Sequence, residues 1–108
     1  MCKITNYQGK TMDFEKQSYV YILFNKRNGT LYVGVTSNLQ GRVYQHKSNI
    51  FDGFTKKHEV HKLGYYEIFY DIRDAIAREK QIKAGSRKNK LELIKSMNPD
   101  WKDLFNEL

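Results

Sequence analysis

The sequence is poor in cysteine and in long apolar runs, and both shortages exclude classes of protein. Its single cysteine, Cys2, excludes an intramolecular disulfide and a zinc site built from several cysteines. A lone thiol suits a reducing cytoplasm, which is the location we expect. No apolar run is long enough to cross a bilayer, and residues 1–18 are too polar for a signal peptide. We therefore expect no membrane partner.

Several common catalytic motifs are also missing. The chain has neither the glycine-rich phosphate-binding loop of nucleotide hydrolases nor a dinucleotide-binding fingerprint. No serine or cysteine is placed as the nucleophile of a triad. His58 and His61 lack a third metal ligand at a convincing spacing, so we do not expect a zinc site there.

Positive charge is abundant. The 108 residues include 19 Lys and Arg against 12 Asp and Glu, for a net charge of +7. Such a balance favours a polyanionic partner, nucleic acid first and an acidic membrane second, although solubility alone would also explain it. Between residues 78 and 95, two acids stand against seven basic residues: Arg78, Lys80, Lys83, Arg87, Lys88, Lys90 and Lys95. Together with Lys56, Lys57 and Lys62, this run could follow a phosphate backbone, while a solvated helix surface explains part of it equally well.

Hydrophobic periodicity predicts an α+β domain. After a tail or loosely packed lead-in at residues 1–17, the expected order is β-β-α-β-α-α-α over residues 18–108. The strands are expected at 19–24, 31–35 and 62–70, and the helices at 39–47, 72–84, 87–97 and after Pro99. Residues 48–61 are expected to form a loop. The three strands should form a mostly antiparallel sheet flanked by helices.

Turn and cap residues punctuate this pattern. Asn28-Gly29 predicts a two-residue hairpin turn between the first two strands. Ser37 or Asn38 can cap the first helix. Gly85 is expected to end the second helix as the residue just beyond it, and Asn98 is expected to cap the last helix.

The predicted turn fixes a strand register and therefore a shared face. With Asn28 and Gly29 as the turn residues, Tyr21 would face Thr36 and Leu23 would face Gly34. Because side chains alternate along a strand, Tyr19, Tyr21 and Tyr32 should share one face, with Gly34 leaving an open spot among them. These tyrosines could equally be ordinary core residues.

Two charged residues stand on apolar helix faces. Arg42 and His46 are four residues apart and share a face with Leu39, where a snorkelling arginine is the alternative to a functional one. Glu79 lies in the stripe formed by Ile72, Ala75, Ile76 and Ile82, which should face the sheet. A carboxylate there needs a partner: either a helix neighbour, such as Arg78, Lys80 or Lys83, or a divalent cation such as Mg²⁺.

These residues together resemble the GIY-YIG nuclease superfamily. The tyrosine triplets Tyr19-Val20-Tyr21 and Tyr32-Val33-Gly34, Arg42, His46 and the helical Glu79 carry the likeness over about residues 18–108. The closer similarity is to the small stand-alone bacterial proteins of that superfamily. Tyr19 stands where the first motif has glycine, and Gly41 stands where a basic residue is common.

The resemblance implies hydrolysis of the DNA backbone with one divalent metal, Mg²⁺ or Mn²⁺, in DNA repair or processing. Tyr21 and Tyr32 would position or deprotonate the attacking water, and Arg42 would stabilise charge on the scissile phosphate. His46 matches a position that often contacts the phosphate or a tyrosine, and Glu79 would hold the metal.

Other residues are expected to contact the substrate rather than to take part in catalysis. The residues expected to bind DNA are Gly34, Lys56, Lys57, Arg78, Lys83, Arg87 and Lys88. Duplex, branched and single-stranded DNA all remain open as substrates. The alternatives to a nuclease are a non-catalytic nucleic-acid-binding module and a basic scaffold for an acidic protein partner.

Overall fold

A three-stranded antiparallel sheet forms the centre of the molecule. The structure, a computed structural model, describes residues 3–5, 11–13, 17–48 and 53–108. The sheet has the strand order β4-β3-β5 and consists of β3 (Ser18–Phe24), β4 (Leu31–Thr36) and β5 (Lys62–Phe69). Every residue of the central strand β3 is buried. The α+β class and the antiparallel sheet predicted from the sequence are confirmed.

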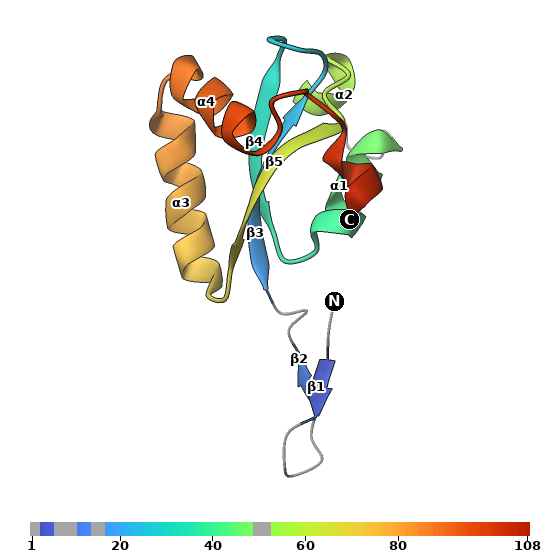
Figure 1. The fold of residues 1–108 in the computed structure, drawn as a ribbon, viewed down its shortest axis with the longest axis vertical. Coiled ribbons are helices and arrows are strands. Elements are labelled where there is room, and N and C mark those ends of the chain that lie inside the picture. Colours follow the sequence, from blue (N-terminus) through green and yellow to red (C-terminus); the bar gives the residue numbers. More distant parts are fainter. Residues whose placement is uncertain (1–2, 6–10, 14–16, 49–52) are drawn as a thin grey trace.

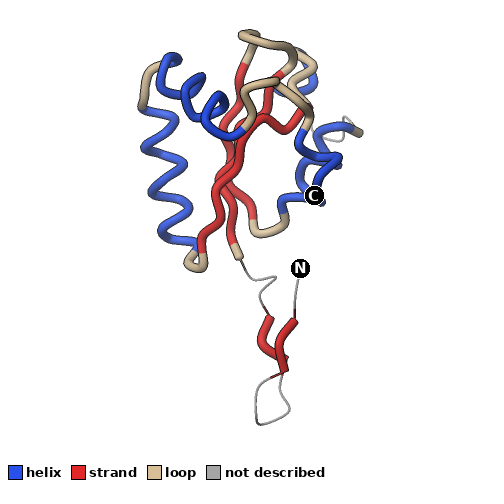
Figure 2. Tube along the Cα trace, viewed as in Figure 1, coloured by secondary structure: helices blue, strands red, loops and turns tan. Residues whose placement is uncertain are grey.

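Helices cover both faces of this sheet (Figures 1 and 2). One layer consists of α3 (Ile72–Ala84) and α4 (Arg87–Met97). The other consists of α1 (Leu39–Lys47), the short α2 (Phe54–Lys57) and the C-terminal 3₁₀ helix η2 (Leu104–Glu107). The bounds of α1, α3 and α4 agree with those expected from the sequence. The helix α2 lies in a stretch that was expected to be a loop, of which residues 49–52 lie outside the described residues.

Each helix layer has its own hydrophobic core, because alternate residues of β3 point to opposite faces of the sheet. Tyr21 and Leu23 pack with Leu39 and Val43 of α1 in one core. The second core, on the face covered by α3 and α4, includes these buried residues: Val20, Ile22, Val33, Ala75, Ile82 and Ile94. Tyr19, Tyr21 and Tyr32 all belong to the α1 side, as the sequence predicts.

The β3–β4 register differs by two residues from the predicted one. Tyr21 pairs with Gly34 and Leu23 pairs with Tyr32. The loop has four residues because only Asn28 has a positive φ, of 55°, whereas the predicted turn needs two such residues. The Asn25 Oδ1 atom closes the loop by accepting hydrogen bonds from the backbone N–H groups of Lys26 and Thr30. Since side chains alternate with a period of two, the shift leaves every side chain on its predicted face.

One predicted helix cap is wrong, while Asn38 caps α1 as expected: its side-chain oxygen accepts a hydrogen bond from the Gly41 backbone N–H. Gly85 follows the end of α3 as expected, with an extended backbone (φ of −75°), and the chain passes directly into the Ser86 cap of α4. Asn98 does not start the last helix. Its buried side chain bonds both backbone groups of Lys102, and Asp103 caps η2 instead.

Two further regions differ from the expectation. A hairpin of β1 (Lys3–Thr5) and β2 (Thr11–Asp13) stands where the sequence predicts a tail or loosely packed lead-in. On α3, Ile72 and Ile76 are exposed rather than buried. Their side chains lie outside the stripe that meets the sheet, which Ala75 and Ile82 occupy. Among the described residues, no helix combines the length and apolar character needed to cross a membrane.

Candidate active site

The phenol of Tyr21 lies at the centre of the candidate site. Only 1% of this residue is exposed, and its ring passes over Gly34, its partner on the edge strand β4. A Cβ atom at position 34 would lie 2.4 Å from the Tyr21 hydroxyl oxygen, so only glycine accepts this close approach. The space expected to be open at Gly34 is therefore filled by Tyr21. Gly34 thereby positions the phenol.

Three aromatic rings meet beside this glycine. The ring centroids of Tyr21 and Tyr32 are 6.4 Å apart, and the imidazole of His46 lies 5.6 Å from the Tyr32 ring and 6.3 Å from the Tyr21 ring. Tyr32 is half-buried, whereas His46 is only 6% exposed. The two strands and helix α1 thus bring together both motif tyrosines and the histidine, as the sequence predicts.

His46 is held between two hydroxyl groups. Its Nε2 atom lies 3.5 Å from the hydroxyl oxygen of Tyr21, and its Nδ1 atom lies 3.1 Å from Oγ1 of Thr55. Burial, followed by the positive charge of Arg42, lowers the pKa of His46 below its ordinary value. A neutral imidazole has one donor and one acceptor nitrogen, so Thr55 and Tyr21 share the two roles between them.

Arg42 and Glu79 complete the surroundings of Tyr21. The pKa of the Tyr21 phenol is raised overall, mainly by burial and then by Tyr32. Arg42 opposes this shift through its positive charge and a hydrogen bond, whereas the negative charge of Glu79 adds to it. Glu79 belongs to α3, on the opposite face of the sheet from α1, but α3 also contacts the edge strand β4. Tyr32, Arg42 and Glu79 therefore all act on one phenol at this edge of the sheet.

Glu79 has the partner that a carboxylate on an apolar helix face requires. Its Oε2 atom accepts a hydrogen bond from Lys83 Nζ, one turn further along α3, at 2.9 Å. Only 14% of the Glu79 side chain is exposed, against 51% of Lys83. Of the predicted ion-pair partners, Lys83 is the one that the described structure pairs with Glu79.

The residues present fit a single divalent cation. Among the described residues, no three His, Cys, Asp or Glu side chains are grouped as a metal cluster. Mg²⁺, however, is commonly held by one or two carboxylates, with water and substrate phosphate completing its shell. Glu79 offers such a carboxylate close to the Tyr21 phenol and partly open to solvent.

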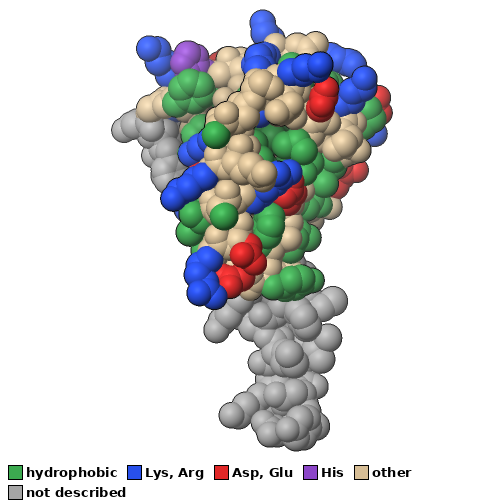
Figure 3. All heavy atoms as spheres, turned by 90° about the vertical axis from the view of Figure 1, so that its left-hand side faces the viewer, with side chains coloured by type: hydrophobic (Ala, Val, Ile, Leu, Met, Phe, Trp, Pro, Cys, Tyr) green, Lys and Arg blue, Asp and Glu red, His purple; other side chains and the backbone are tan. Residues whose placement is uncertain are grey.

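The residues expected to bind DNA fall into two groups. Lys56, Lys57 and Lys88 are exposed, and Lys and Arg side chains gather around the upper part of the α3–α4 face in Figure 3. Three further expected contacts, Lys83, Arg87 and Arg78, bind groups of the protein itself. Lys83 binds Glu79, and the Arg87 guanidinium donates to the Asn28 and Gly29 carbonyl oxygens at 2.6 Å.

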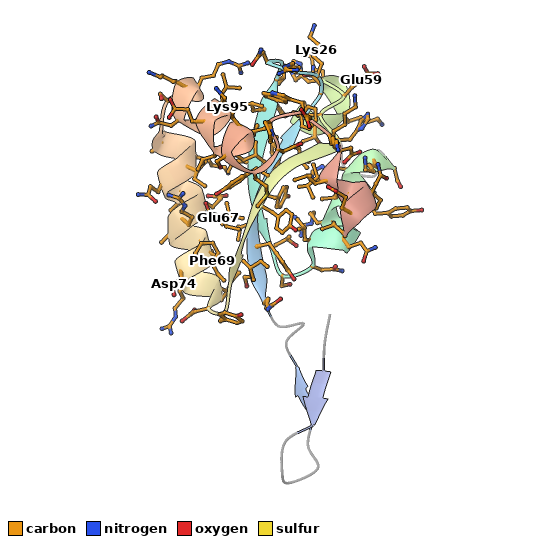
Figure 4. The ribbon with its side chains drawn as sticks, in the orientation of Figure 1. Lys26, Glu59, Glu67, Phe69, Asp74 and Lys95 are labelled. Atoms are coloured by element: carbon orange, nitrogen blue, oxygen red, sulfur yellow. The ribbon has the colours of Figure 1, made fainter. Side chains whose placement is uncertain are left out.

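Arg78 is the most firmly engaged of the expected DNA contacts. Its guanidinium pairs with the Glu67 carboxylate of β5, with N–O distances of 2.9 to 3.2 Å. Tyr65 also donates its hydroxyl hydrogen bond to Glu67, and Figure 4 labels Glu67 on the side of the sheet that α3 covers. This network ties α3 to β5, so Arg78 has a structural role here.

Thr55 and Phe54 are the residues of this region that sequence reasoning missed. Thr55 is buried and bonds His46, while the Phe54 ring lies 6.3 Å from that of Tyr32. Both belong to the four-residue helix α2. A segment of four residues shows no helical period, so only an aromatic residue followed by a threonine and two lysines could have drawn attention to it.

Comparison with known proteins places the chain in a family. Residues 17–92 match the model of the GIY-YIG catalytic domain. A UPF0213 protein of Clostridium perfringens is 40% identical over 73% of this chain and 84% of its own length. One from Syntrophus aciditrophicus is 39% identical over 78% of this chain and 95% of its own length.

A solved structure supports the same relationship. The solution NMR structure of a UPF0213 protein from Bacillus halodurans matches with a TM-score of 0.50 and 25% identity, over 81% of this chain and 92% of the other. It shares the arrangement of a three-stranded antiparallel sheet flanked by helices. The chain belongs to the GIY-YIG nuclease family, alongside the small single-domain bacterial UPF0213 proteins.

Proposed function

We propose that the protein is an endonuclease that hydrolyses phosphodiester bonds of DNA with one divalent cation, Mg²⁺ or Mn²⁺, held by Glu79. The observation that carries this proposal is the environment of the Tyr21 phenol. Its pKa is influenced by the phenol of Tyr32, the guanidinium of Arg42 and the carboxylate of Glu79. Phosphodiester hydrolysis requires an oriented water, positive charge on the phosphate and an oxygen ligand for a metal. Membership of the family supports the same reaction.

Arg42 supplies fixed positive charge in this mechanism. Its guanidinium binds a non-bridging oxygen of the scissile phosphate, where negative charge builds up as the pentavalent transition state forms. Arg42 is half-buried on α1 and acts on the Tyr21 phenol, so a phosphate that it binds lies beside the phenol oxygen. A preorganised charge of this kind requires little rearrangement during the reaction.

Tyr21 orients the attacking water. Because burial raises the pKa of its phenol, Tyr21 holds its proton firmly and is a poor base by itself. The Tyr21 hydroxyl lies 3.5 Å from Nε2 of His46. In the tautomer that carries its proton on Nδ1, Nε2 accepts the phenol proton, which leaves the lone pairs of the phenol oxygen to accept from water. The Tyr32 ring lies beside both the Tyr21 ring and the imidazole and offers a second hydroxyl for the same water.

Glu79 would hold the divalent cation through its carboxylate. When bound, the cation supplies positive charge to the phosphate and to the leaving oxygen, and it lowers the pKa of water and phenol groups close to it. Glu79 must exchange its hydrogen bond with Lys83 for this ligand. Lys83 is half-exposed and can then turn toward a DNA phosphate.

The DNA backbone follows the exposed lysines around the site. Lys56 and Lys57 lie on α2, next to Tyr32, and Lys88 lies on α4. Arg87 donates to the carbonyl oxygens of Asn28 and Gly29, which are uncharged, so it keeps its full charge for the phosphates. We assign the nuclease domain to residues 18–108 and its work to DNA repair or processing in the cytoplasm.

Nicking of a supercoiled plasmid tests the proposal. The protein should convert it to open-circular DNA with Mg²⁺ or Mn²⁺, and chelation with EDTA should stop the reaction. A non-catalytic nucleic-acid-binding module would bind the plasmid, with salt-sensitive affinity, and leave it intact with either ion. A scaffold for an acidic protein would show no affinity for DNA.

A further inference from the structure

An exposed aromatic ring continues the row of rings that begins in the candidate active site. Phe54 of α2 is 48% exposed, and its ring lies 6.3 Å from that of Tyr32 at an interplanar angle of 29°. Tyr32 in turn contacts His46. The His58 imidazole lies 4.6 Å from the Phe54 ring and is tilted against it by 48°. The row therefore leads from the buried Tyr21 phenol to the surface.

Phe54 is not what anchors its helix. The buried residue of α2 is Thr55, which bonds His46, and Val60 closes the segment by donating its backbone N–H to the Thr55 carbonyl oxygen. Half of the large apolar surface of Phe54 faces water, where it gains little for folding. An exposed ring beside a catalytic site is available for a ligand with a flat apolar face.

The charge around Phe54 selects a polyanionic ligand. Lys56 and Lys57 follow it on the same helix and are exposed, and the guanidinium of Arg42 lies at the other end of the row of rings. Flat apolar faces attached to a chain of negative charges are the chemistry of nucleobases on a phosphate backbone. Surfaces that bind single-stranded nucleic acid combine aromatic platforms and basic groups in this way.

We propose that Phe54, backed by Tyr32 and flanked by His58, stacks an unpaired nucleobase next to the scissile phosphate, so that the preferred substrate is DNA with an unpaired base at the cleavage site. In intact duplex both faces of each base are covered by its neighbours, and only a displaced or single-stranded base can use the ring. This inference rests on the proposed nuclease function and names its substrate class.

Fluorescence of 2-aminopurine tests the stacking directly. A single-stranded oligonucleotide carrying this base is titrated with the full-length protein, with Ca²⁺ in place of Mg²⁺ so that no cleavage is needed. Stacking on Phe54 should quench the fluorescence of the 2-aminopurine base. Phe54→Leu keeps an apolar side chain on α2 but removes the flat face, so we expect quenching to be lost and single-strand affinity to fall about tenfold. Phe54→Trp should retain both.

Three comparisons complete the test. Tyr70→Leu removes a ring that is 78% exposed but lies outside the row, and it should bind single strands as the wild type does. Affinity for the same sequence as a duplex should be unchanged by Phe54→Leu. Equal single-strand affinity for Phe54→Leu and the wild type would overturn the stacking inference while leaving a DNA-binding nuclease in place. A protein that binds neither DNA form would contradict the proposed function as well.

Discussion

The phenol of Tyr21 lies directly against Gly34, and the two residues fit only because position 34 has no side chain. An ideal Cβ there would be 2.4 Å from the hydroxyl oxygen and 2.5 Å from the carbon that bears it. Gly34, the glycine of the second motif, thereby places the phenol at the sheet edge, where Arg42 and Glu79 act on it.

Gly34→Ala should consequently disturb both the core and the site. The added methyl forces the Tyr21 ring away from β4, and overpacking of this kind costs about 1–3 kcal/mol of unfolding free energy. Urea unfolding followed by circular dichroism measures the loss, and cleavage should slow because the phenol moves. Gly85→Ala is the matched control, since its nearest contact would be 3.3 Å and its φ of −75° suits alanine. Equal stability of the wild type and Gly34→Ala would contradict the packing described.

The Thr55–His46 contact yields a second prediction. Thr55→Val keeps the shape of the side chain but removes the hydroxyl that bonds Nδ1 of His46. Loss of one hydrogen bond, worth about 1 kcal/mol, should lower the cleavage rate by roughly five- to tenfold by freeing the imidazole to turn from Tyr21. DNA affinity should not change, and Thr55→Ser should restore the rate. If Thr55→Val cleaved DNA at the wild-type rate, the claim that the Thr55 hydroxyl positions His46 would be wrong.

The Glu79–Lys83 ion pair competes with the proposed cation. Lys83→Met removes this competitor, so half-maximal cleavage should need roughly twofold less Mg²⁺. This factor corresponds to the free energy of about 0.4 kcal/mol that an ion pair four residues apart on a helix contributes. Lys80→Met is the control because it removes the same charge from the same helix without breaking the pair. If both variants changed the Mg²⁺ requirement equally, general electrostatics rather than the Glu79 pair would explain the shift.

His46 should make stability depend on pH. Its folded-state pKa lies below the ordinary value of 6.5, first because of burial and then because of Arg42. Between the two values the unfolded chain binds a proton that the folded protein does not, so the unfolding free energy falls as the pH drops through that range. Urea unfolding from about pH 8 to about pH 5 should show a smaller decrease for His46→Gln than for the wild type. Parallel pH profiles for the two proteins would refute a buried neutral imidazole.

Much of the fold could be predicted because long elements carry strong patterns. Periodicity identifies α1, α3 and α4 from the sequence, and the polar cap at Asn38 adds to the evidence for α1. The face shared by Tyr19, Tyr21 and Tyr32 also follows from strand alternation. The hairpin register could not be predicted, because the Asn25 side chain closes a loop longer than the two-residue turn.

The candidate site was predicted less completely than the fold. The residues of the family motif could be named from the sequence, but Thr55 could not, since nothing local marks one threonine in a polar stretch as the partner of His46. Tertiary contacts also determine which Lys and Arg side chains form ion pairs within the protein. Arg78 pairs with the Glu67 carboxylate, eleven residues away in the sequence, and no sequence pattern indicates this pairing.

Cleavage by Glu79→Gln tests the central claim most directly, because the amide keeps the size of the side chain and removes the charge that would hold a divalent cation. Plasmid nicking in Mg²⁺ and DNA affinity in Ca²⁺ are measured together for this variant and the wild type. We predict that nicking disappears while DNA affinity stays within about twofold of the wild type. Nicking by Glu79→Gln at the wild-type rate would contradict a metal-bound phosphodiester at this site.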